Sequence, residues 1–287
     1  MRTVERGFMQ DSEVGEAHSC ENARERWAFR PLVLNKIMSS SPTAAVLVIG
    51  DEILSGRTQD TNTSYIARFL GSLGIDLKEA RVVPDIEDEI VAALNALRAR
   101  YSYVFTTGGI GPTHDDITAD AVAKAFGVGI DYHPEALAML AARYANPADF
   151  NEMRKRMARI PFTAELVKNS ASTAPGFQIG NVFVMAGVPI IMRAMLEDIA
   201  PKLERGALVH TATVQARIGE GKIAAGLQTI QKNYPDLAIG SYPYYREDGF
   251  GVQLVARGRD AVKVEAAAGE IETLIRREGT EPERVKS

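Results

Sequence analysis

The chain has 287 residues, 46% hydrophobic and 24% charged, so it can bury a substantial core in one or two domains. Its formal net charge of -4 argues against a general polyanion-binding surface, which makes nucleic acid a minority interpretation. The single cysteine, Cys20, excludes an internal disulfide. No apolar run is long enough to cross a bilayer, so we expect a cytoplasmic protein.

Residues 1–42 differ in composition from the remainder of the chain. They carry mixed charges, lack the apolar region of a signal peptide and end in a Ser-rich linker after a second methionine, Met38. We predict an N-terminal extension that is disordered or precedes a native start at Met38. Mass spectrometry of the native N-terminus would decide between the two.

Strand and helix patterns alternate along residues 43–204. Apolar, β-branched runs predict strands, and each is followed by apolar residues at helical spacing. Such alternation implies right-handed crossovers, so we predict an α/β fold with a doubly wound, mostly parallel sheet and helices on both faces. Strands are predicted at 44–49, 77–83, 103–105 and 181–185, helices at 62–73, 85–100, 119–126 and 190–203, and an insertion or outer layer at 134–159.

A glycine-rich loop, residues 106–118, runs without a gap from a predicted strand into a helix. Three glycines let backbone N–H groups approach an anion, which is how α/β proteins hold phosphates. Asp115 and Asp116 add charge that suits a cation, and a phosphate bridged by a divalent metal reconciles both features. We predict that Asp115 and Asp116 bind metal or act in catalysis, and that phosphate or substrate contacts Thr107, Gly108, Gly109, Gly111, Pro112 and Thr113.

Plainer interpretations of this loop stay open. The glycines can serve a tight turn that binds nothing, and one aspartate can simply cap the following helix. His114 is a general acid or base, or an exposed loop residue.

Two further loops come after predicted strands and belong to the same edge if the sheet is doubly wound. Asp51 and Glu52 complete a metal site, contact a ribose or lie in a solvated turn, and Asn62 binds a ligand or caps a helix. A polar stretch at 169–177 offers hydroxyls for phosphate. The predicted substrate or phosphate contacts here are Gly50, Asp51, Glu52, Asn62, Thr173, Gly187 and Pro189, with Asp51 as a further metal ligand.

The pattern changes after Gly206 to strand, helix, strand, strand and helix, which predicts a small α+β domain at 205–278. Gly219-Glu220-Gly221-Lys222 suggests an RNA-clamping loop, but its acid and the net charge count against RNA, so we expect a structural or dimer-forming role. Residues 279–287 are charged and poor in apolar residues, and we predict a frayed tail.

Four ordered motifs resemble the competence/damage-inducible protein A (CinA) family and its molybdopterin-binding, molybdenum-cofactor-biosynthesis-like domain. The resemblance spans about residues 43–203 and extends to the KH-type module that comes next in that family. Full-length relatives also carry a C-terminal amidase domain, which this chain ends before, so nicotinamide mononucleotide deamidation is not expected. The motifs are Gly50-Asp51-Glu52-Ile53-Leu54-Ser55-Gly56 with Asp60-Thr61-Asn62, Thr107 to Thr113 with Asp115-Asp116-Ile117-Thr118, Thr173-Ala174-Pro175-Gly176, and Gly187-Val188-Pro189.

The resemblance implies a site for a small-molecule nucleotide or pterin that carries phosphate. It favours hydrolysis of a pyrophosphate, in ADP-ribose or flavin adenine dinucleotide (FAD), with Mg, Mn or Co. The alternatives are adenylyl transfer to molybdopterin and non-catalytic pterin or nucleotide binding, and a homo-oligomer is possible. Ala186 and Ile191 replace a proline and an acid that relatives often show, which puts the role of the Gly187 loop in doubt.

Overall fold

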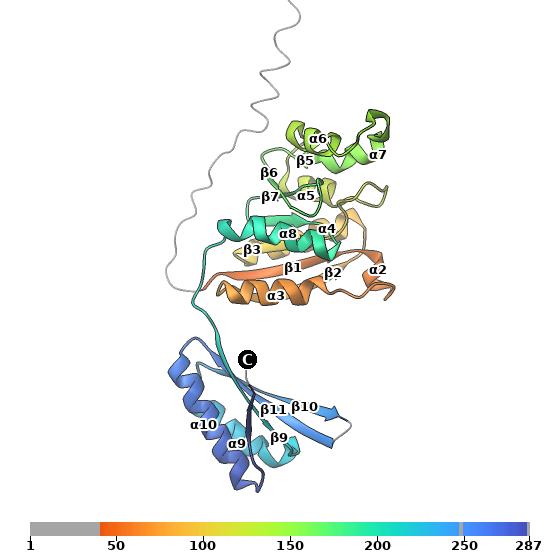
Figure 1. The fold of residues 1–287 in the computed structure, drawn as a ribbon. Helices are drawn as coiled ribbons and strands as arrows, with labels where there is room; N and C mark the ends of the chain where they lie inside the picture. The colour runs from red at the N-terminus through yellow and green to blue at the C-terminus, as the bar shows by residue number, and fades with distance from the viewer. Residues whose placement is uncertain (1–40, 247–248, 286–287) are drawn as a thin grey trace, which may run out of the picture. The chain divides into compact units, whose positions relative to one another are not determined.

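The computed structural model describes residues 41–246 and 249–285, which form two compact units (Figure 1). The first unit is built mainly on residues 44–63 and 78–203, and the second mainly on the chain from residue 204 onward. The predicted N-terminal extension, residues 1–42, lies almost entirely outside the described residues. Within the described ranges, no helix combines the length and apolar character needed to span a membrane.

A six-stranded sheet in the order β2-β1-β3-β8-β7-β6 forms the centre of the first unit. β1, β3 and β8 pair in parallel, whereas β7 and β6 extend the sheet in antiparallel fashion. The predicted α/β fold with a mostly parallel sheet is therefore confirmed. The strands are β1 (Thr43–Ile49), β2 (Asp76–Val83), β3 (Tyr103–Thr107), β6 (Glu165–Val167), β7 (Gly176–Ile179) and β8 (Val182–Met185).

Helices lie on both faces of this sheet (Figure 1). Alternate residues of β1, Ala45, Leu47 and Ile49, share a buried core with α4 (Glu87–Arg100) and α5 (Thr118–Phe126). α8 (Pro189–Ile199) covers the other face and begins with the predicted proline, whose missing N–H costs nothing there. The short α2 (Asp51–Leu54) and α3 (Asn62–Ser72) come after β1 along the chain.

An outer layer at residues 130–161 confirms the predicted insertion. It contains α6 (Pro134–Ala141), α7 (Glu152–Lys155) and a small antiparallel sheet of β4 (Ile130–Tyr132) and β5 (Arg159–Pro161). The 3₁₀ turns η1 (Pro147–Asp149) and η2 (Arg156–Ala158) flank α7, and η3 (Ala200–Lys202) continues from α8. β4 to β7 are missing from the sequence prediction because none of these three- or four-residue strands is a continuous apolar run like that of β8.

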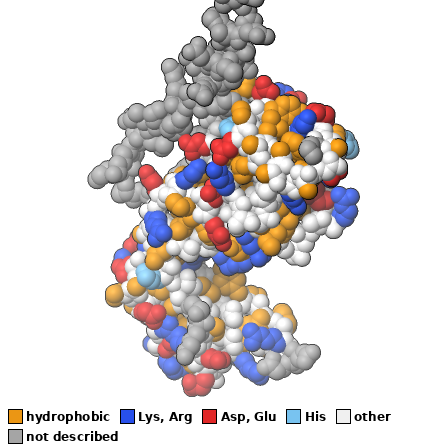
Figure 2. Space-filling model, turned by 45° about the horizontal axis from the view of Figure 1, so that its top comes forward, with side chains coloured by type: hydrophobic (Ala, Val, Ile, Leu, Met, Phe, Trp, Pro, Cys, Tyr) orange, Lys and Arg blue, Asp and Glu red, His pale blue; other side chains and the backbone are white. Residues whose placement is uncertain are grey.

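The second unit has the predicted strand, helix, strand, strand, helix order, in a four-stranded antiparallel sheet β10-β11-β9-β12. Its hydrophobic core lies between that sheet and both helices. Acidic and basic side chains are interspersed over the face seen in Figure 2. The elements are β9 (His210–Ala216), α9 (Glu220–Asn233), β10 (Ala238–Arg246), β11 (Gly249–Gly258), α10 (Ala261–Arg277) and β12 (Glu283–Val285).

The prediction of a frayed tail at 279–287 is wrong for its described part. Residues 283–285 form β12, which pairs with β9. The side chain of Arg284 forms ion pairs with Glu265 and Glu272 of α10. The charged residues that suggested solvent exposure therefore attach this strand to the neighbouring helix.

Candidate functional site

Three loops meet at the carboxyl ends of β1, β3 and β8. Gly108 has a φ of 104°, and a Cβ there would lie 2.1 Å from the carbonyl oxygen of Ile49. A Cβ on Gly187 would lie 3.4 Å from the Cα of Gly108, whose amide donates to the Met185 carbonyl at 3.2 Å. Only glycine allows the β3 loop to approach β1 this closely. The expected gathering of the three loops at one edge is present in the structure.

Asn62 connects the segment that follows β1 to the loop that follows β8. The residue is 7% exposed, and its Nδ2 donates to the carbonyl oxygen of Gly187 at 2.7 Å. The capping alternative applies to Asp60 instead, because Asp60 Oδ1 accepts from the backbone amides of Asn62 and Thr63 at 2.9 and 3.1 Å. Asn62 is therefore held in place by its amide group, with its side-chain oxygen uncommitted.

Several buried polar atoms near these loops have no hydrogen-bond partner within the described part of the chain. They are Asn62 Oδ1 and the hydroxyls of Thr63, Thr106 and Thr173. Buried polar groups are normally satisfied, so unpaired ones mark places where a ligand or water completes the bonding. Thr107 is 2% exposed within β3, which makes its side chain part of the wall and not of the open surface.

The glycine loop is shaped from its far end by Thr118, the first residue of α5. Thr118 Oγ1 donates to the Gly108 carbonyl and the Thr118 amide donates to the Gly109 carbonyl, both at 3.0 Å. Gly109 has a φ of 65°, and a Cβ there would lie 2.2 Å from Thr118 Oγ1. Among the described residues, the amides of Gly109, Ile110 and Gly111 donate to no protein acceptor. The loop thus presents three consecutive free donors.

Asp116 organises the same loop. Its Oδ2 accepts from the amide of Thr113 at 2.7 Å and from the Thr113 hydroxyl at 2.6 Å. A Cβ on Gly111 would lie 2.7 Å from this oxygen. α5 has no side-chain cap, so the capping alternative for these aspartates is wrong. His114 is exposed, and Pro112 lies beside Gly111 in the loop.

Three carboxylates, those of Asp51, Glu52 and Asp115, act electrostatically on Asp85, and we call these four residues the acidic edge. Asp85 Oδ2 accepts from the Asp51 amide at 2.9 Å. Burial raises the pKa of Asp85, and the negative charges of Asp51, Glu52 and Asp115 raise it further. These acids come from the ends of three strands, and a cation would relieve the repulsion that the other three exert on Asp85.

Sequence reasoning missed Asp85 as a site residue. The acid begins the turn into α4, where acidic residues have a sufficient explanation in the helix dipole. The usable signal is its position two residues after the end of β2, which places it at the same edge as the other loops.

The acidic edge fits a divalent metal that shares its coordination with a phosphate. No three His, Cys, Asp or Glu side chains of residues 41–246 and 249–285 form a ready-made metal cage. Mg²⁺ does not require one, because it is usually held by one or two carboxylates together with water and substrate phosphates. Carboxylate oxygens are the hard donors that this ion prefers.

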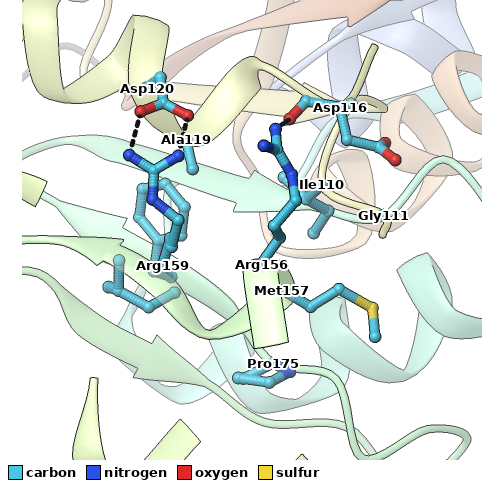
Figure 3. A pocket seen from close by; sticks show the side chains of 12 residues that line it. Ile110, Gly111, Asp116, Ala119, Asp120, Arg156, Met157, Arg159 and Pro175 are labelled. Carbon is cyan, nitrogen blue, oxygen red and sulfur yellow. Dashed lines mark hydrogen bonds and ion pairs between the residues drawn. The ribbon is translucent and has the colours of Figure 1, made fainter. Parts of the chain in front are cut away.

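A small pocket on the glycine loop, which we call the arginine pocket, lies next to the outer layer (Figure 3). Gly109, Gly111 and Asp116 line it together with Arg156 of η2 and Arg159 of β5. Pro175 also lines it and lies shortly after the predicted Thr173 along the same loop. Neither arginine belongs to a sequence motif, and Arg156 is 40 residues away from Asp116, so no local pattern pointed to them.

The remaining predicted residues at this edge are Gly50, Gly187 and Pro189. The Gly50 amide donates to the Val83 carbonyl at 3.2 Å, which ties β1 to β2 just before Asp51. Gly187 and Pro189 are exposed at the start of α8. Their neighbours Val188 and Ile190 are exposed apolar residues, at 53% and 67%.

Comparison with known proteins shows which families the two parts of the chain match. Residues 45–205 match the family described as probable molybdopterin binding domain, and residues 208–283 match that described as FAD synthase, middle domain. The KH-type assignment of the second unit remains a prediction.

Relatives cover most of the chain. A protein of Archaeoglobus fulgidus is 33% identical over 230 residues, covering 80% of this chain and 96% of the relative. One from Aeropyrum pernix is 32% identical, covering 80% and 91%. A crystal structure of the protein CinA, of unknown function, from Thermoplasma acidophilum is 36% identical with a TM-score of 0.54, covering 57% of this chain and 99% of that one. The chain therefore belongs to the probable molybdopterin-binding domain family and is CinA-like.

Proposed function

We propose that this protein binds a phosphate-bearing nucleotide at the joined loop ends and hydrolyses its pyrophosphate in a reaction that depends on a divalent metal. The observation that carries the proposal is the meeting of free loop amides with the acidic edge. The amides of Gly109 to Gly111 suit phosphate oxygens, and the carboxylates suit a cation. A site that favours an anion beside a site that favours a cation is accounted for by a ligand that brings a phosphate and a metal ion together.

In the proposed reaction, the oxygen of a water molecule forms a bond to one phosphorus and the bridging P–O bond breaks, so the second phosphate leaves with the bridging oxygen. The protons of the water pass to phosphate oxygens or to solvent. ADP-ribose would give AMP and ribose 5-phosphate, and FAD would give AMP and flavin mononucleotide. One or two of the acidic-edge carboxylates Asp51, Asp85 and Asp115 would hold the metal together with water and phosphate oxygens, and the metal would neutralise phosphate charge and make water more acidic. The loop amides would fix the phosphate, and Asn62 Oδ1 would accept a hydrogen bond from the ligand.

The test is direct. The purified protein is incubated with ADP-ribose and with FAD in a series of Mg²⁺, Mn²⁺ and Co²⁺, and AMP is measured. We expect AMP with at least one metal and none after chelation. Absence of AMP with every metal would refute the hydrolase proposal.

A second candidate is adenylyl transfer to molybdopterin, which the match to the probable molybdopterin-binding domain favours. A phosphate oxygen of the pterin would then attack the α-phosphorus of ATP, and pyrophosphate would leave. Release of pyrophosphate from ATP only when molybdopterin is present identifies this reaction. A pterin or nucleotide that raises the melting temperature without any product would instead indicate a binding protein.

A further inference from the structure

We propose that Arg156 binds the second phosphate of a diphosphate ligand, in the arginine pocket beside the glycine loop. The inference rests on the proposed function, since it extends the same site. It assigns a diphosphate-recognition role to the outer layer, which contributes none of the predicted site residues.

The first support is charge. Arg159 is already committed, because its Nη1 and Nη2 donate to the two oxygens of Asp120 at 2.8 and 2.7 Å. Arg156 forms no ion pair with any carboxylate of the described residues, and its Nε is buried without a partner. A partly buried guanidinium without a counter-ion favours an anion at this place.

The second support is position. Arg156 Nη2 lies 3.5 Å from the backbone oxygen of Asp116, which places the guanidinium against the end of the glycine loop. Figure 3 shows the Asp116 carboxylate pointing away from it. That carboxylate accepts hydrogen bonds from Thr113 and forms no ion pair with the arginine.

The third support is complementarity with the loop. The free amides of Gly109, Ile110 and Gly111 are neutral donors, and Gly109, Ile110 and Gly111 line the same pocket as Arg156. Neutral donors suit one phosphate, but a second phosphate doubles the charge that must be compensated. A planar guanidinium supplies that charge and can donate two hydrogen bonds to one phosphate.

The experiment measures AMP release from ADP-ribose and direct binding of inorganic pyrophosphate by calorimetry. Arg156→Gln should raise KM, and the Kd for pyrophosphate, roughly tenfold to a hundredfold, with a smaller change in kcat. Arg156→Lys should keep part of the affinity, because it retains the charge and loses the fork. The Kd for AMP, which has one phosphate, should change by less than about threefold in both variants.

Arg143→Gln is the matched control, since Arg143 is exposed in the same outer layer and the charge change is identical. Thermal melting checks that each variant is folded. Unchanged KM and pyrophosphate affinity in Arg156→Gln would overturn the inference, as would an equal loss of AMP binding. Wild-type protein that binds pyrophosphate through Arg156 but releases no AMP would refute hydrolysis while supporting this site.

Discussion

The acidic edge and the arginine pocket share one loop, which contributes Asp115 to the first and Asp116 to the second, but they differ in electrostatic character. Asp115 adds to the repulsion around Asp85, whereas Asp116 lines the pocket with an unpaired arginine. Adjacent aspartates therefore differ in their surroundings, although they are equivalent in a motif. The difference indicates that the loop separates a cation-favouring region from an anion-favouring one.

That separation matters for a phosphate ligand with a metal. A bare carboxylate cluster repels phosphate, and an arginine cluster repels a cation. Because the acidic edge and the arginine pocket adjoin the same glycine loop, a single diphosphate with its metal could contact both regions. The comparison can be tested by substitutions that damage both regions, one region or a single residue.

The largest effect is expected from Gly108→Ala, which should damage both regions together. Gly108 has a φ of 104°, and the added Cβ would meet the Ile49 carbonyl at 2.1 Å. We expect a loss of about 3 kcal/mol of stability, which corresponds to a fall in melting temperature of roughly 6–12 °C. Calorimetry measures the stability, and AMP release measures the activity.

Gly71→Ala is the matched control, because Gly71 lies within α3 and its Cβ would have no neighbour within 4 Å. This change should stabilise the helix by about 0.5–1 kcal/mol. A Gly108 variant as stable and as active as the control would show that the close approach to β1 is not needed.

Next in size is the contrast between Asp115→Asn and Asp116→Asn. The first should reduce metal-dependent AMP release about a hundredfold with little change in melting temperature, because an exposed carboxylate of the acidic edge is lost. The second should raise KM about tenfold, because the loop loses part of the support that Asp116 gives to Thr113. The effect is smaller than that of Asp115→Asn, since an asparagine oxygen can still accept one bond from Thr113. Metal titrations of both variants separate the effects. Identical profiles would remove the distinction between the two regions.

The parts of the site that come directly after strands could be predicted from sequence, because apolar β-branched runs and glycine loops are local patterns. Gly108, Asp115 and Asn62 lie in such loops, and the parallel order brings them to one edge. Asp85 also follows a strand but was overlooked, and Arg156 could not be predicted in this way. Asp85 looks like an ordinary helix-start acid, and Arg156 reaches the loop only through the packing of the outer layer.

The short antiparallel strands illustrate the same limit. β6 and β7 extend the sheet beyond β8, yet each has only three or four residues. Their pairing is decided by neighbours along the sheet and not by their own pattern. Tertiary packing also shapes the arginine pocket. Two residues that line this pocket belong to the same region, because Pro175 precedes β7 and Phe177 lies within β7.

The smallest expected effect concerns Asp85→Asn, which isolates repulsion within the acidic edge. Burial and three neighbouring acids raise the pKa of Asp85 above its ordinary value of 3.8, so its charged form opposes folding. The penalty is absent below the unfolded pKa, grows as pH rises through the native pKa and stays constant above it. Asparagine carries no charge and can still accept from the Asp51 amide.

The variant should therefore melt at a higher temperature than wild type at neutral pH, and the difference should shrink as the pH falls towards 3.8. Melting curves across this range, with and without Mg²⁺, test both the sign and the cause. Mg²⁺ should stabilise wild type more than the variant, because a bound cation offsets the repulsion that asparagine has already removed. A variant that is less stable at neutral pH would show that the Asp85 charge is already compensated and that the edge does not favour a cation.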